Sequence, residues 1–361
     1  MRILYLTDPC PDYLADLLYV GLCQAIGPEW VVDYPYKAVY HDPLQRVHYI
    51  PQILARSYRE EEVAALLHDK QFDLAILSSP RRGTIAAWES LSRCGAMPPL
   101  VLIDGEDDAT LRQGPFSRYR CALYFKREYR LHRDVGMCGR VRRWSTGLAG
   151  TVLSQRTHPL PLAVALETIP TIPSIQRDVD VSYAARISHP KRRQAVEMLR
   201  HASGIRFQGG VYAETEDRQS MALSGFPRFL MKLKGDPVIT AAQRGAKLSQ
   251  AEYHALFGRS KMALSVRGGG FDTLRYWEIV ASGALLLSEQ PDIEIPNNFE
   301  HGKHAVFFRP DLSDLVDLVQ AYASDAQACV AMAAEGHKHM LQYHTCERRA
   351  EYLLEICRRT L

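Results

Sequence analysis

Residues 267–278 of the chain read RGGGFDTLRYWE, and residues 281–289 read ASGALLLSE. The glycines Gly268, Gly269 and Gly270 follow an apolar run at 261–266 that predicts a β-strand, and an amphipathic helix is predicted after them. Glycines at such a turn let a ligand approach the backbone closely, and the start of a helix attracts anions. The stretch therefore predicts a strand–turn–helix–strand unit with a phosphate or diphosphate site at the turn.

Charged side chains follow the glycines at helical spacing. Asp272 or Thr273 is expected to cap the helix, and Arg275 and Glu278, three residues apart, share one of its faces. We expect Asp272, Thr273 and Arg275 to lie at the diphosphate and Glu278 to accept hydrogen bonds from a ribose diol. The alternative interpretation is a capping aspartate followed by a surface Arg–Glu pair.

These residues, with Gly283 after them, resemble the nucleotide-sugar site of GT-B glycosyltransferases, in particular the group-1 branch that includes spore-maturation-type proteins. Exostosin-type transferases carry a related C-terminal motif. The resemblance covers residues 255–355 well and the N-terminal half by general layout. It implies two Rossmann-like parallel-sheet domains that face each other across a cleft. It also implies a nucleotide-sugar substrate, a hydroxyl acceptor, and no bound metal or other cofactor.

Length and composition agree with a two-domain globular protein. The 361 residues exceed the usual limit of one hydrophobic core, and 47% hydrophobic with 24% charged residues is an ordinary balance. No apolar run approaches the roughly 18 residues of a membrane span, and the first apolar run is too short for a signal peptide, so we expect a cytoplasmic protein. The cysteines form no Cys-x-x-Cys pair, and no metal site is predicted.

Apolar runs and helical patterns alternate along the first half, which predicts an α/β domain with a parallel sheet covered by helices on both faces. The predicted strands are at 2–6, 30–33, 73–77, 100–103 and 121–125. A second alternating series begins at residue 179, after a proline-rich stretch. We therefore predict an acceptor domain at 1–150, a linker at 151–178, a nucleotide-sugar domain at 179–343, and a final helix at 344–361 that packs back on the first domain.

The first turn of the second domain is basic. The resemblance implies that Arg186, His189 and Arg192 contact the donor phosphates, although the glycine that many relatives carry here is replaced by an Ala-Ala-Arg run. A solvated basic first turn is the alternative. The nucleobase is expected near residues 209–212, with Leu248 and Tyr253.

Transfer to a hydroxyl group needs a general base, which we expect from the N-terminal domain. Ligands of parallel sheets bind at the carboxyl ends of the strands. The acids there are Asp8 and Asp12 after the first strand and Asp104, Glu106, Asp107 and Asp108 after the fourth, and we select Asp8 and Asp104. Asp8 is the leading candidate, because Asp104 precedes a glycine and is equally consistent with an ordinary turn. Some retaining relatives carry a second acid where this chain has Gly270, so the stereochemistry stays open.

Residues 112–143 contain ten Lys or Arg residues and two acidic residues. Such a patch attracts anionic partners, so an acidic glycan, a lipid-linked acceptor, a membrane surface or modified nucleic acid is the functional interpretation. A solvated helix surface is the alternative. Two other functions remain open: a nucleotide-sugar epimerase of the same fold, and a non-catalytic nucleic-acid-binding module.

Overall fold

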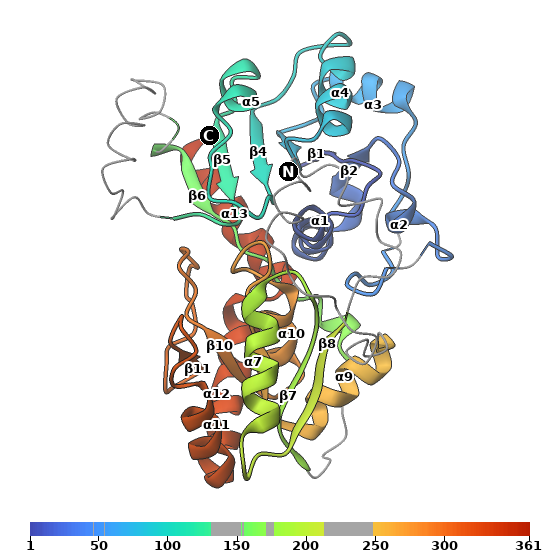
Figure 1. Cartoon of the computed structure of the whole chain (residues 1–361). Coiled ribbons are helices and arrows are strands. Elements are labelled where there is room, and N and C mark those ends of the chain that lie inside the picture. Colours follow the sequence, from blue (N-terminus) through green and yellow to red (C-terminus); the bar gives the residue numbers. More distant parts are fainter. Residues whose placement is uncertain (46, 54, 131–152, 154, 171–176, 213–247) are drawn as a thin grey trace, which may run out of the picture.

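The computed structural model describes residues 1–45, 47–53, 55–130, 153, 155–170, 177–212 and 248–361. Two parallel β-sheets, one in each half of the chain, form the cores of two domains (Figure 1). Helices cover both faces of each sheet, so the strands are buried and apolar on both sides. The predicted class, α/β with two Rossmann-like domains, is confirmed.

The N-terminal sheet has six strands in the order β2-β1-β3-β4-β5-β6. They are β1 (Ile3–Leu6), β2 (Val31–Tyr34), β3 (Leu74–Leu77), β4 (Leu100–Asp104), β5 (Leu123–Lys126) and β6 (Thr157–Pro159). The α-helices of this half are α1 (Tyr13–Ile26), α2 (Ala38–His41), α3 (Glu60–His68), α4 (Arg82–Leu91) and α5 (Gln113–Arg118). Short 3₁₀ turns lie at η1 (Pro28–Trp30) and η2 (Leu166–Thr168).

The C-terminal sheet has five strands in the order β11-β10-β9-β7-β8. They are β7 (Val179–Arg186), β8 (Phe207–Tyr212), β9 (Ser260–Ser265), β10 (Leu285–Glu289) and β11 (Val306–Phe308). The helices are α7 (Pro190–His201), α9 (Gln250–Arg259), α10 (Leu274–Ala281), α11 (Leu315–Ser324), α12 (Ala326–Tyr343) and α13 (Cys346–Thr360).

Strand β6 lies inside the range predicted as the linker. Thr157 pairs with Tyr124, so this segment extends the N-terminal sheet. The sequence Thr-His-Pro has no apolar run of its own, and its strand conformation comes from pairing with β5. Part of the predicted linker, 171–176, lies outside the described residues.

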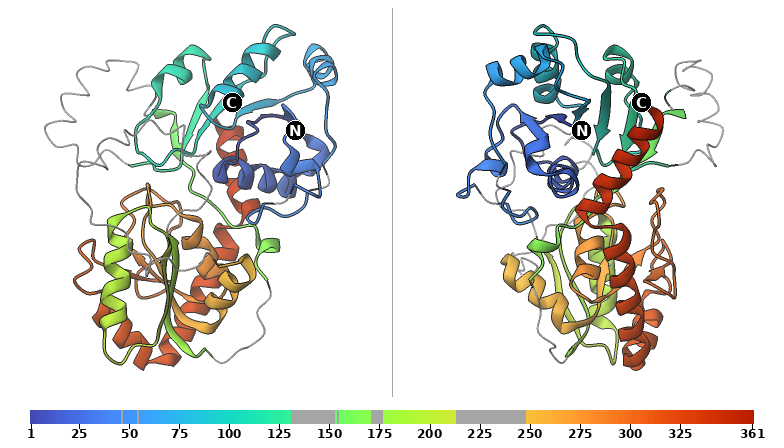
Figure 2. Two further views of the ribbon diagram at one scale, coloured as in Figure 1. Left: turned by 45° about the vertical axis from the view of Figure 1, so that its right-hand side comes forward. Right: turned by 180° about the vertical axis from the view of Figure 1, so that it is seen from behind.

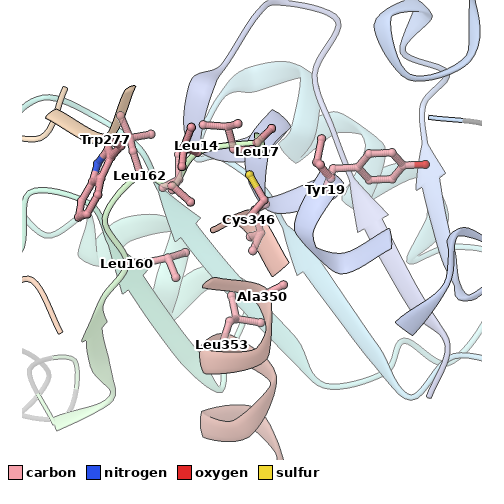
Figure 3. Close-up of a cluster of buried hydrophobic side chains, with 14 of the residues drawn as sticks. Leu14, Leu17, Tyr19, Leu160, Leu162, Trp277, Cys346, Ala350 and Leu353 are labelled. Carbon is pink, nitrogen blue, oxygen red and sulfur yellow. The ribbon is translucent and has the colours of Figure 1, made fainter. Parts of the chain in front are cut away.

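The last helix, α13, crosses from the C-terminal domain to the N-terminal one and packs against α1 (Figure 2). Figure 3 shows the buried cluster that this crossing creates, with side chains from α1, the segment 160–165, Trp277 and α13. Gly21 of α1 lies so close to the backbone of Cys346 that a Cβ atom there would collide with the Cys346 carbonyl oxygen. The two domains therefore share one hydrophobic core at the crossing.

His344 occupies the turn between α12 and α13. Its Nε2 is 2.8 Å from the carbonyl oxygen of Asn297, and its Nδ1 is 3.0 Å from Nη2 of Arg349. Since Arg349 can only donate, Nδ1 accepts and Nε2 carries the proton, so the imidazole is neutral. Burial and the nearby Arg349 charge hold the pKa of His344 well below its usual range.

We predict that Gly21→Ala destabilises the chain by about 1–3 kcal/mol, because the added methyl group pushes α13 away from α1. Urea unfolding measures the change. Gly114→Ala in α5 is the matched control, since a Cβ atom there has no heavy atom within 4 Å and the substitution favours the helix. Equal stability of the two variants would contradict the close packing of α1 and α13.

We also predict that stability falls as the pH drops below about 6.5, the usual pKa of a histidine. In that range the unfolded chain binds a proton at His344 that the folded chain does not, so acid favours unfolding. Unfolding free energies measured from neutral to mildly acidic pH test this. His344→Asn should flatten the slope by up to about 1.4 kcal/mol per pH unit relative to the wild-type chain.

Candidate functional site

The carboxyl ends of β7 and β9 and the start of α10 meet at one edge of the C-terminal sheet. Arg275, in the first turn of α10, donates from Nε to the carbonyl oxygen of Ala184 at 2.9 Å. Its guanidinium lies 5.3 Å from the ring centre of Tyr183, a cation–π contact. Two residues of β7 therefore fix the position of this cation.

Glu278 lies one turn further along α10 and is buried. Its Oε2 accepts a hydrogen bond from the hydroxyl of Tyr253, on α9, at 2.9 Å. Burial raises the pKa of Glu278, while the Tyr253 hydrogen bond and the Arg275 charge oppose that rise. The structure thus brings together a cation and a carboxylate on one face of α10, with Tyr253 beside them.

The hydroxyl of Tyr183 is buried and has no hydrogen-bond partner among the described residues. Buried hydroxyl groups are normally paired, so an unpaired one beside Arg275 is consistent with a site that a polar ligand completes. Gly209 on β8 has φ +113°, and a Cβ atom there would collide with the carbonyl oxygen of Tyr183. Only glycine allows β8 to approach β7 in this way.

Each glycine of the 268–270 turn faces a charged side chain. A Cβ atom at Gly268 would lie 3.0 Å from the Arg192 guanidinium, whereas Gly269 and Gly270 face the carboxylates of Asp107 and Glu128. Those two acids belong to the N-terminal domain. The turn is therefore packed against the N-terminal domain at Gly269 and Gly270, where a side chain would collide with these carboxylates.

Glu128 accepts hydrogen bonds from the amides of Phe271, at 3.0 Å, and Asp272, at 2.8 Å. These amides belong to the turn whose backbone we expected to bind phosphate. In this structure a buried carboxylate of the N-terminal domain takes that place. The sequence analysis did not select Glu128. The rule that ligands bind at the carboxyl ends of parallel strands does point to the residues just after β5, where Glu128 lies.

Asp272 does not cap α10. The N-cap position belongs to Thr273, whose hydroxyl lies 3.4 Å from that of Ser265 and makes no bond to a helix amide. The Asp272 carboxylate accepts from the amide of Leu162 at 2.6 Å and from the indole of Trp277 at 2.9 Å. Burial raises the pKa of Asp272 to about 6. Its side chain therefore faces the segment after β6 rather than solvent.

Arg192 is buried behind the glycine turn. Its Nε donates to the carbonyl oxygens of Val266, at 3.2 Å, and Arg267, at 2.9 Å, and its Nη1 donates to that of Arg186 at 2.9 Å. Burial lowers the pKa of Arg192 to about 10. His189 is the N-cap of α7, where its Nδ1 accepts from the amide of Lys191 at 3.2 Å. Burial also lowers the pKa of His189.

The two predicted bases differ in their surroundings. Asp104 is fully buried, where Lys126 lies 3.0 Å and Arg112 2.9 Å from its oxygens, and the hydroxyl of Tyr124 donates to it as well. Asp8 is half-buried at the end of β1, and its Oδ1 accepts from the amide of Cys10 at 2.9 Å. Asp104 is held by three side chains, whereas Asp8 retains access to solvent.

A cavity of about 960 Å³ lies between the two domains. The N-terminal domain contributes Tyr13 at the start of α1 and the segment 39–53 apart from Leu44 and from residue 46, which lies outside the described residues. The C-terminal domain contributes Arg186 and Gln250. Gln250 also donates to the carbonyl oxygen of His48 at 2.8 Å, so the two domains touch along the cavity wall.

The basic patch is largely neutralised in its described part. Five of its six described cations pair with carboxylates within 4 Å: Arg112, Arg118, Lys126, Arg127 and Arg130. Residues 131–143 of the patch lie outside the described residues. In the part of the chain that the structure describes, no helix has the length and apolar character to cross a bilayer. Within the same residues, no three His, Cys, Asp or Glu side chains are grouped to hold a metal ion.

Residues 191–355 match the family described as glycosyl transferase-like. Among solved structures, the chain is similar to HepE of Anabaena in complex with UDP-glucose, with 11% identity and a TM-score of 0.58, over 99% of this chain and 100% of that one. It is also similar to a glycosyltransferase of Rickettsia africae, with 10% identity and a TM-score of 0.60, over 99% and 98% of the two chains. No curated protein matches the sequence.

Sucrose-phosphate synthase of Thermosynechococcus elongatus is similar as well, with 12% identity, a TM-score of 0.53, and coverage of 99% and 98% of the two chains. At these identities the likeness establishes the fold, and it extends over the full length of the chain.

We predict that Glu128→Gln weakens the contact between the domains. Each carboxylate oxygen accepts from one backbone amide, and in glutamine one of the two oxygens is replaced by an NH2 group that cannot accept, so the unfolding free energy should fall by about 1–3 kcal/mol. Small-angle scattering should also show a larger radius of gyration. Glu89→Gln is the matched control, since Glu89 pairs with Arg118 at the surface of the same domain. A variant as stable and compact as this control would show that Glu128 does not anchor the domains.

Proposed function

We propose that this chain, which has the GT-B fold and whose residues 191–355 match the glycosyl transferase-like family, moves a sugar from a nucleotide-sugar to a hydroxyl group of an acceptor. The observation that carries this proposal is the pair formed by Arg275 and Glu278 on one face of α10. Arg275 is oriented by Ala184 and Tyr183, and Glu278 by Tyr253. HepE, which shares the fold, was solved with UDP-glucose, and we take a UDP-sugar as the donor to test first.

In the proposed complex Arg275 and the first turn of α10 neutralise the leaving diphosphate, so that transfer needs no bound metal. The buried hydroxyl of Tyr183, which has no partner among the described residues, is proposed to donate to a phosphate oxygen when the donor binds. Arg192 is proposed to act indirectly. Its hydrogen bonds to the carbonyl oxygens of Val266 and Arg267 hold the glycine turn in place. Arg186 and His189 lie at the same edge and complete the basic surroundings.

Glu278 is proposed to accept hydrogen bonds from the ribose diol. The Glu278 carboxylate is buried and accepts one hydrogen bond, from the Tyr253 hydroxyl, so it can accept further hydrogen bonds from a diol. Tyr253 then orients the carboxylate. The nucleobase is proposed to lie near the end of β8 at Tyr212, whose position beside Arg186 follows from the β7–β8 register.

Asp8 is proposed as the general base. Its carboxylate is half-buried at the carboxyl end of β1, where ligands of parallel sheets bind. The Cys10 amide orients the carboxylate through Oδ1, and Oδ2, which lies beside Gly83 at the start of α4, is proposed to receive the proton of the acceptor hydroxyl. Asp104 is the weaker candidate, because two cations and a tyrosine hydroxyl already surround its carboxylate.

We predict that Arg275→Ala and Glu278→Gln each weaken UDP-glucose binding by about 1.5–3 kcal/mol, the size of one charge-assisted hydrogen bond. Isothermal titration calorimetry measures the affinities. The fold should survive, because the apolar face of α10 is buried independently through Tyr276, Ile279 and Val280.

The chain offers a matched control for both variants. Arg348 and Glu351 repeat the Arg-x-x-Glu spacing on α13, 2.7 Å apart and at the surface. Arg348→Ala should therefore leave the affinity unchanged. A wild-type protein that binds none of a panel of nucleotide-sugars, or variants that bind like this control, would overturn the proposed donor site.

A further inference from the structure

We infer that the cavity between the two domains binds an uncharged carbohydrate acceptor, with the ring of Tyr13 as the surface on which a sugar stacks. The inference rests on the proposed sugar transfer and specifies its second substrate. It is carried by the position of the cavity, its size, the chemistry of its walls and the balance of charge around it.

The position of the cavity connects the two parts of the proposed chemistry. Pro11 and Tyr13 line its N-terminal wall and lie just after the loop that holds Asp8. Arg186 lines the opposite wall, and its carbonyl oxygen accepts from Arg192, the side chain behind the glycine turn. A molecule in this cavity therefore touches the segment next to the proposed base and the edge next to the proposed donor site.

The cavity is large for a small-molecule site. Its volume of about 960 Å³ is at the upper end of the range of about 300–1,000 Å³ that such sites span. The volume suits an extended acceptor with more than one ring.

The cavity walls combine exposed aromatic and amide side chains. Tyr13 is 40% exposed and meets Tyr49 in an edge-to-face contact with ring centres 4.6 Å apart. Gln45, Gln52 and Gln250 also line the cavity. An amide both donates and accepts hydrogen bonds, as a sugar hydroxyl does, and an aromatic ring covers the apolar face of a sugar.

A buried hydrogen-bond network around Asp16 holds the part of the cavity wall that contains Tyr40 and Tyr49. The carboxylate of Asp16 accepts from the hydroxyls of Tyr40 and Tyr49, both at 2.7 Å, and from Nζ of Lys37 at 2.6 Å. Asp16 is fully buried, and two of the three donors, Tyr40 and Tyr49, line the cavity, while Lys37 lies just before that segment. The wall is therefore held against α1 before any ligand arrives, as a binding site requires.

The charges around the cavity favour a neutral ligand. Among the described lining residues the carboxylates of Asp42 and Glu167 outnumber the Arg186 cation, and His41 at the wall pairs with the buried Asp33 at 2.9 Å. A site for nucleic acid or a sulfated glycan presents an excess of cations. The described cations of the 112–143 patch do not supply that excess, since five of six are paired with carboxylates.

The test is binding of glycan probes to the full chain saturated with UDP, measured by saturation-transfer NMR and calorimetry. The neutral probes are maltotriose, chitotriose and a panel of neutral oligosaccharides with other terminal sugars. A heparin-derived tetrasaccharide and oligothymidylate are the anionic probes. We expect a neutral glycan to bind and Tyr13→Ala to weaken it about tenfold, the effect of losing one aromatic contact.

Tyr13→Phe keeps the ring and should retain the affinity, which separates stacking from a folding defect. Trp30→Ala is the control, because Trp30 is 41% exposed and lies outside the cavity lining. Binding of UDP should be unchanged in all three variants. The inference is overturned if UDP binds but no neutral glycan does, if only the anionic probes bind, or if Tyr13→Ala has no effect. Absence of UDP and UDP-sugar binding would instead overturn the proposed function itself.

Discussion

The contact between Glu128 and the start of α10 is the constraint on which the rest of the structure depends. Two amides of the glycine turn donate to this carboxylate, and Asp272 in turn accepts from the amide of Leu162. Glu128, Asp272 and Leu162 are buried, so separating them would leave unpaired polar groups away from water. The N-terminal domain, the segment after β6 and the proposed donor site are therefore fixed at one point.

This anchor explains why the functional side chains are arranged as they are. Glu128 of the N-terminal domain and Arg192 of the C-terminal domain both hydrogen-bond the backbone around the glycine turn. The position at which α10 begins is therefore fixed. Arg275 and Glu278 then project from its first two turns toward β7 and α9. The same docking of the domains closes the walls of the cavity, whose two sides come from different halves of the chain.

Much of the site could be predicted because its signals are local. Glycines before a helix, and an arginine and a glutamate three residues apart, identify a turn and a helix face without any knowledge of the fold. Glu128 could not be found in this way, since in the sequence it stands among cations and looks like a surface residue. Asp272 looked like a helix cap because capping is judged from neighbours in sequence, whereas its partners Leu162 and Trp277 are set by packing.

The sequence by itself determined the two α/β domains, their strands and helices, and the charged face of α10, because hydrophobic periodicity and turn residues act over a few positions. Tertiary structure alone decided that Thr157 joins the first sheet, that Asp104 is enclosed by Lys126 and Arg112, and that most of the described basic patch is neutralised. Those outcomes depend on contacts between residues far apart in the chain, and such contacts leave no periodic signal.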